Sequence, residues 1–234
     1  MIRIGARTVA FALLLALLAM SGRPAGADDA QDARQLVEKA HLTFESFIAD
    51  ANLGENLRSL VNKARGVLIY PQVLRGAFIF GASGGSGVLL VRDLAGGKWS
   101  GPAFYTIGEV SFGLQAGADA SEVVLVALTD RGVTALLSTS AKLGANASVA
   151  AGPVGVGVTG ATANISADIV SYSRNKGLYI GASFEGAVVA VRDSLNTAYY
   201  GKAVTPTQIL IQREVSNPQA APLIEAIAKV VGGR

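Results

Sequence analysis

Apolar residues recur along this chain with two different periods, and the longer period predicts its first helix. Between positions 36 and 51 they return every three or four residues, which places them on one face of a helix. They are Leu36, Val37, Ala40, Phe44, Phe47, Ile48 and Ala51. The opposite face mixes acidic and basic side chains, whereas a helix lying on a membrane surface is richer in Lys and Arg. We therefore expect this helix to pack against the domain.

Further helices are predicted from shorter patterns and their end signals. Residues 55–65 carry apolar positions at helical spacing, and Gly66 is expected to end this helix. Thr129 or Asp130 is a good N-cap for a short helix that follows. Near the C-terminus, Thr205-Pro206 and Asn217-Pro218 both combine a capping side chain with a proline at the first helical position.

Short apolar runs closed by glycines fill residues 63–117 and predict a β-core. The expected strands cover residues 67–70, 77–82, 88–92, 103–107, 111–115 and 123–128. No linker, charge run or low-complexity segment divides residues 28–234. We therefore predict a single α+β domain whose core is a Gly-rich, mainly antiparallel β-sheet or barrel, flanked by N-terminal, middle and C-terminal helices.

Two glycine-rich stretches invite a nucleotide-binding interpretation that their surroundings disfavour. Residues 81–87 read GASGGSG, but no Lys-Ser pair and no helix start follow, as a phosphate-binding P-loop needs. A turn or a bulge with close backbone approach fits better. Residues 155–160 match G-x-G-x-x-G, yet residues 161–164 open a helix poorly and the βαβ spacing is missing.

The first 27 residues predict a cleaved secretory signal and change the charge of the chain. Arg3 and Arg7 precede an apolar run over residues 8–20, and residues 25–27 are a small-residue cleavage site. That run is too short for a membrane span, which needs about 20 residues. Three of the 20 Lys and Arg lie in this segment and none of the 17 Asp and Glu, so the mature chain is formally neutral. No general attraction to nucleic acid or anionic membranes is expected.

Groups for catalysis or metal binding are scarce. The chain has no cysteine, and its single histidine, His41, lies on the polar face of the first helix. A Ser-His-Asp site would have to use that residue, and no G-x-S-x-G motif supplies the serine. The carboxylates near the core, Glu109, Glu122, Asp168 and Glu185, are expected to cap turns or form ion pairs. We predict no enzyme, no metal site and no cofactor.

Several short motifs occur in one order and resemble a known family. They include Tyr70-Pro71, GASGGSG at 81–87, WSGP at 99–102, SFGLQAG at 111–117, AGPVG at 151–155, SYS at 171–173 and YYG at 199–201. In this order the chain resembles the SYLF domain family over residues 53–211. The resemblance implies a domain that binds lipids and membranes, with phosphoinositides and in some cases actin filaments as the ligands of eukaryotic members. With the signal segment, it implies a bacterial exported member that lies in the periplasm or associates with the envelope.

The candidate lipid-binding residues flank the first predicted strands. Lys63, Arg65 and Arg75 are candidates to meet phosphate headgroups, and Trp99 beside Lys98 is a candidate interfacial anchor. Surface solubility and core packing are the alternative roles of all five residues. A second function stays open: a structural or scaffold protein that binds a protein partner or itself, to which residues 145–158 would add an edge strand.

Overall fold

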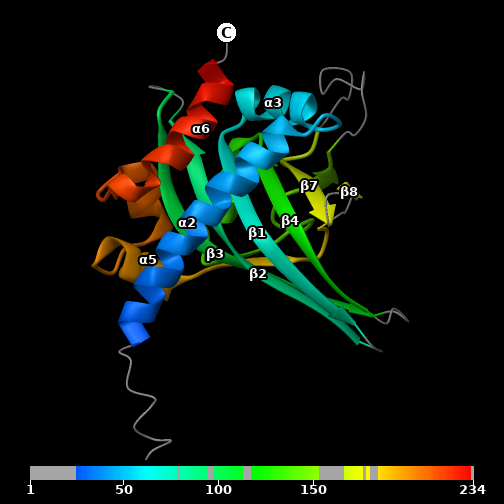
Figure 1. Ribbon diagram of the computed structural model, residues 1–234, viewed down its shortest axis with the longest axis horizontal. Helices are drawn as coiled ribbons and strands as arrows, with labels where there is room; N and C mark the ends of the chain where they lie inside the picture. The colour runs from blue at the N-terminus through cyan, green and yellow to red at the C-terminus, as the bar shows by residue number, and fades with distance from the viewer. Residues whose placement is uncertain are drawn as a thin grey trace, which may run out of the picture.

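The computed structural model describes residues 25–77, 80–93, 97–112, 117–152, 166–175, 178–179 and 184–232. Two helices open the described part of the chain, four long strands follow, and shorter helices and strands complete it (Figure 1). The helices are α2 (Ala25–Ala49), α3 (Gly54–Lys63), α4 (Asp130–Leu137), α5 (Asp193–Tyr200), the π-helix η1 (Gln208–Gln212), the 3-10 helix η2 (Pro218–Ala220) and α6 (Ala221–Gly232). The strands are β1 (Gly66–Ala77), β2 (Phe80–Arg92), β3 (Trp99–Phe112), β4 (Gly117–Ala127), β5 (Ser140–Lys142), β6 (Val149–Ala151), β7 (Ile169–Asn175), β8 (Leu178–Tyr179) and β9 (Val188–Val191).

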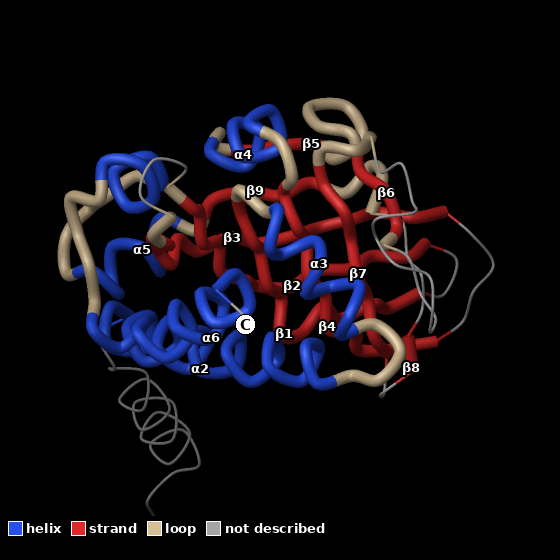
Figure 2. Tube along the Cα trace, turned by 90° about the horizontal axis from the view of Figure 1, so that it is seen from above, coloured by secondary structure: helices blue, strands red, loops and turns tan. Residues whose placement is uncertain are grey.

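The described strands form one nine-stranded sheet with the order β5-β9-β3-β2-β1-β4-β7-β6, and β8 pairs with β7. Every pairing is antiparallel except that of β6 with β7. The sheet curls until its two ends approach each other, where the bridge between Leu143 and Ala147 lies between β5 and β6 (Figure 2). The predicted α+β class with a barrel-like antiparallel core is confirmed.

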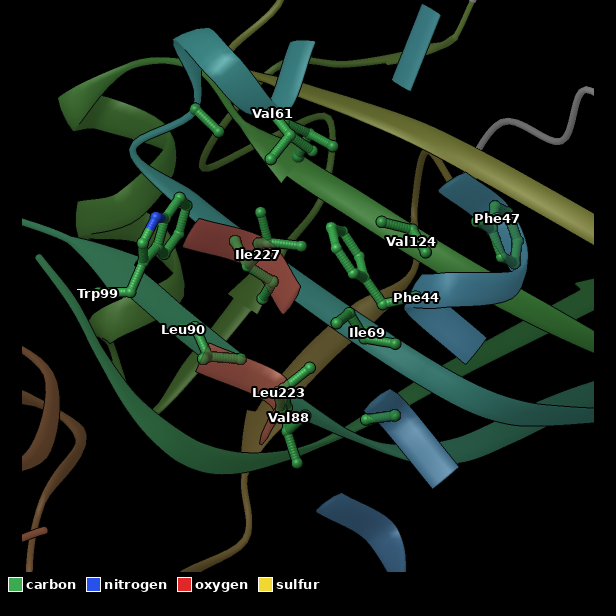
Figure 3. Packing of buried hydrophobic residues seen from close by; sticks show 14 of the residues in the cluster. Phe44, Phe47, Val61, Ile69, Val88, Leu90, Trp99, Val124, Leu223 and Ile227 are labelled. Carbon is green, nitrogen blue, oxygen red and sulfur yellow. The ribbon is translucent and has the colours of Figure 1, made fainter. Parts of the chain in front are cut away.

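Both faces of the sheet are buried, which explains the continuous apolar runs of its central strands. One face packs under α2, α3, α5 and α6, with Ile69, Leu90 and Val124 against Phe44 and Ile227 (Figure 3). The opposite, concave face packs against α4 and η1. Its buried residues include Leu68, Tyr70, Leu89, Tyr105, Leu125, Leu136 and Ile209.

Helix α2 confirms the predicted amphipathic pattern. Val37, Ala40, Phe44 and Phe47 are fully buried against the sheet and α6, so the expectation of packing on the domain is correct. The helix begins at Ala25, earlier than the pattern alone predicted, and ends at Ala49. The predicted place of Ala51 on the buried face is therefore wrong, because Ala51 lies exposed in the turn after the helix. Among the described helices, none is long and apolar enough to cross a membrane. Residues 1–24 lie outside the described part of the chain, so the signal segment stays a prediction.

The glycine-rich segments required corrections to the predicted strands. Residues 81–87 are no turn: they lie inside β2, paired with β1 on one side and β3 on the other. The alternative of a bulge is correct, because the register of β1 with β2 shifts opposite Gly87. The expected close approach is correct, because a Cβ at Gly87 would lie 2.4 Å from the ring of Tyr70. Gly66 does not end α3 but begins β1, since Ala64 already has an extended conformation. Residues 153–165, with the G-x-G-x-x-G motif, lie outside the described residues.

The predicted capping signals are correct. The Thr129 hydroxyl accepts a hydrogen bond from the backbone N–H of Gly132 at the start of α4. The Asn217 side chain accepts one from the N–H of Gln219 and so caps η2, which leads directly into α6. Thr205 accepts one from the N–H of Gln208 at the start of η1. These local contacts fix where α4, η1 and η2 begin.

Candidate functional site

Two arginines lie side by side at the open end of the hairpin that β1 and β2 form. Arg65 directly precedes β1 and Arg92 ends β2, and the backbone N–H of Arg92 donates to the carbonyl of Arg65 over 2.8 Å. Because Gly66 pairs with Val91, the next position of the antiparallel register sets the two arginines opposite each other. Like charges in such a pair destabilise a sheet unless other groups or a ligand offset them.

A third arginine reaches the same place from the far end of the chain. Arg213 follows η1, and its guanidinium donates to the Ser100 hydroxyl (2.8 Å) and pairs with Asp93 (2.9 Å). Its φ of 58° makes it the one non-glycine residue with positive φ in the part of the chain that the structure describes. Such strain persists where the surroundings impose it, and it concentrates, as π-helices do, at functional sites.

The three arginines line a pocket of about 370 Å³ together with two carboxylates and an apolar wall. Asp130 pairs with Arg65 and Asp93 with Arg213. Arg92 donates to the carbonyl oxygen of Asn62 over 3.0 Å, and no described residue gives it a carboxylate. The pocket therefore carries one unbalanced positive charge, that of Arg92. The Arg92 guanidinium retains N–H groups that are available to an anion.

The apolar wall of this pocket reaches the protein surface. It consists of Val91, Val133, Leu210 and Ile211. Ile211 is 48% exposed, one of the few large apolar side chains that the described surface presents to solvent. A ligand with an anionic group and an adjoining apolar part would meet matching chemistry here.

The structure gathers some of the predicted site residues and separates others. Arg65 lines the pocket; Lys63 is the exposed last residue of α3, two positions before it. Lys98 is exposed, and its carbonyl accepts from the N–H of Asp93 at the pocket wall. Arg75 lies opposite Ser83 and Asp119 in the distal part of β1. Ten positions from Arg65 at about 3.3 Å each place it roughly 30 Å away.

Of the two roles considered for Trp99, interfacial anchor and core packing, the structure supports core packing. Only 7% of its surface is exposed, and it packs beside Leu90 in the core under the helices (Figure 3). The structure thus places Trp99 in core packing rather than at an interface. Arg92 and Arg213 were missed as site residues, because no local motif marks residues that only the tertiary fold brings together.

Three of the residues considered for catalysis contact other side chains or backbone groups. His41 contacts Glu45 one turn further along α2 (3.3 Å). Glu122 pairs with Arg174. Asp168 accepts from the Thr129 hydroxyl (2.6 Å) and from the backbone N–H of Ser148 (2.9 Å), and these hydrogen bonds hold the pKa of its carboxyl below the usual value. In the described part of the chain, no three His, Cys, Asp or Glu side chains are grouped to hold a metal ion.

Comparisons with known proteins agree with the motif order. Residues 108–230 match the family model described as "Ysc84: Las17-binding protein actin regulator". The chain is 32% identical over 170 residues to the human "SH3 domain-containing YSC84-like protein 1", covering 72% of this chain and 49% of that protein. It is 31% identical over 173 residues to "Protein YSC84" of Saccharomyces cerevisiae, covering 72% of this chain and 36% of that protein. The match thus spans half or less of the length of these relatives.

Proposed function

Because this chain belongs to the Ysc84 (SYLF) domain family, we propose that it is a non-catalytic binding protein that docks on membranes through anionic lipid headgroups. The observation that carries the proposal is the convergence of Arg65, Arg92 and Arg213 on one pocket beside an exposed apolar side chain. A guanidinium group can donate two parallel hydrogen bonds to the oxygens of one phosphate. An adjoining apolar residue suits the boundary between headgroup and acyl chain.

The local charge around the pocket supports this role although the mature chain is formally neutral. Arg92 has no carboxylate partner among the described residues, and Lys63 and Lys98 lie exposed close to the rim. A basic residue near an anionic membrane contributes about 1 kcal/mol, and this attraction is screened by salt. Binding would therefore be local, modest and dependent on ionic strength.

Co-sedimentation of residues 28–234 with vesicles tests the proposal. We expect binding to phosphatidylglycerol vesicles at low salt, weaker binding at high salt, and little binding to phosphatidylcholine vesicles. Equal binding to both lipids would argue against a charged headgroup site. Absence of binding to either lipid would contradict the proposal and favour a protein partner.

A protein partner is the second candidate function, and the family description favours it. The family model names an actin regulator that binds Las17, which suggests a scaffold role for this chain. Strand β6 ends the strand order of the described sheet and pairs with β7, so this part of the sheet suits addition of a partner's strand. Light scattering across protein concentrations and co-sedimentation with actin filaments, both without lipid, test this function.

The proposed location is the periplasm or envelope of a bacterium. The basic start, the short apolar run and the small-residue site of residues 1–27 support export. Expression of the full chain in a Gram-negative host, followed by fractionation and mass measurement, tests it. A mature protein that starts at Asp28 in the periplasmic fraction is expected; an unprocessed cytoplasmic chain would contradict it.

A further inference from the structure

A second pocket is lined by residues of α3 and of the C-terminal turns of α2 and α6. These three helices contact one another and lie side by side in Figure 1. The volume of this pocket is about 470 Å³, within the range of small-molecule sites. It shares Asn62 with the surroundings of the arginine pocket but none of that pocket's lining residues. We call it the three-helix groove.

The floor of the three-helix groove is apolar and continuous with the core. Phe44 is almost fully buried, and Ile48, Ala226 and Val230 are partly buried side chains that pack against the same core cluster. An apolar chain that lies on these residues would be removed from water and would contact side chains that pack against the core. Each methylene that the floor covers would tighten binding about fourfold.

Two cations stand at the mouth of the groove. Arg58 uses one guanidinium nitrogen to donate to the carbonyl of Ile48 at the end of α2 (2.8 Å). Lys229 lies exposed in the last turn of α6. Neither has an ion-pair partner among the described residues. The one carboxylate that lines the groove belongs to Glu45, which is 3.3 Å from His41 on its own helix, so one positive charge remains unbalanced.

We propose that the three-helix groove binds a single-chain anionic amphiphile of the fatty-acid class. The carboxylate would lie between Lys229 and the free N–H groups of Arg58, and the alkyl chain would cover Ile48, Ala226 and Val230. The net positive charge at the groove favours an anionic head group, and the apolar floor favours an alkyl tail. This site is separate from the headgroup pocket and does not depend on the function proposed for it.

Calorimetric titration with dodecanoate below its micelle concentration tests the site directly. Dodecanoate should bind more tightly than octanoate because it covers more of the floor, and more tightly than dodecanol or dodecylammonium because of its charge. Lys229→Gln should weaken dodecanoate binding about twofold to fivefold and leave dodecanol binding unchanged. Glu45→Gln should strengthen dodecanoate binding. The matched control is Lys202→Gln, at an exposed lysine outside the groove.

A filled floor gives the second arm of the test. Ala226→Trp should abolish binding of both dodecanoate and dodecanol, with thermal unfolding as the measure of folding. The proposal is overturned if Lys229→Gln binds dodecanoate as tightly as Lys202→Gln, if folded Ala226→Trp still binds, or if dodecylammonium binds as well as dodecanoate. Vesicle binding that survives Ala226→Trp would separate this groove from the headgroup pocket.

Discussion

Replacement of Arg174 by Met should cost more stability than any other single loss of a charge in the described structure. This side chain is 11% exposed and fastens α2 to strands β4 and β7. Its guanidinium contacts Glu122 at 2.5 Å, Asp50 at 3.7 Å and the Ser46 hydroxyl at 2.8 Å, and it lies 4.7 Å from the centre of the Phe47 ring. Methionine keeps much of the volume and removes the charge.

The size of the stability loss depends on how well water can solvate the carboxylates that lose their partner. Breaking a fully buried ion pair costs about 3–5 kcal/mol, but Glu122 and Asp50 are 34% and 18% exposed, so water can partly solvate them. With the lost cation–π contact, we expect the free energy of unfolding to fall by about 2–3 kcal/mol. For a domain of this size, the melting temperature would fall by roughly 5–10 °C.

Urea unfolding followed by circular dichroism measures this effect, and Arg131→Met is the matched control. Arg131 is 68% exposed and lies 3.8 Å from the carboxylate of Asp168. Its loss should therefore change stability by less than about 0.5 kcal/mol. Glu122→Gln in the Arg174→Met background should recover part of the loss, because it removes the unpaired charge. Equal stability of the two methionine variants would refute the reasoning.

Three further predictions concern stability. Gly87→Ala should cost about 1–3 kcal/mol in urea unfolding, because its Cβ would lie 2.4 Å from the Tyr70 ring, whereas Gly108→Ala meets nothing closer than 3.9 Å and should be nearly neutral; similar losses would contradict this. Burial raises the pKa of Tyr70 and of Tyr105 above the usual 10.0, so their contribution to stability should be fully present below about pH 10 and should decline above it in unfolding titrations; a flat profile above pH 10 would contradict this. The pKa of Asp168 is lowered from 3.8, so its stabilisation is present above that pH and is lost as pH falls through the folded value; Asp168→Asn should be less stable at neutral pH by an amount that shrinks in acid, and a pH-independent difference would disprove the role.

The sequence carried most information where structure is set locally. The three-residue and four-residue spacing of α2 and the capping residues Thr129 and Asn217 act within a few positions, and the predictions from them are correct except at Ala51, which lies beyond the end of α2. Strand lengths were predicted less well, because glycines that usually break strands here allow close contacts inside β2. Whether a glycine ends a strand or admits a neighbouring ring depends on residues far along the chain.

The candidate site was predictable only in part for the same reason. Arg65 was identified because it stands beside a predicted strand, but Arg92 and Arg213 join it through strand register and the return of the chain after α5. Arg75 has similar sequence surroundings and lies far from the pocket. Charge and position in the sequence cannot separate these arginines, whereas the register of the sheet does.

Arg75 therefore supplies the control for the measurement that tests the central claim most directly: co-sedimentation of wild type, Arg92→Gln and Arg75→Gln with phosphatidylglycerol vesicles at low salt. The account predicts that Arg92→Gln weakens binding about fivefold, as the loss of one headgroup contact of about 1 kcal/mol requires, and that Arg75→Gln binds like wild type. If Arg92→Gln binds like wild type, or if both variants lose binding equally, the arginine pocket is not where this protein meets a membrane.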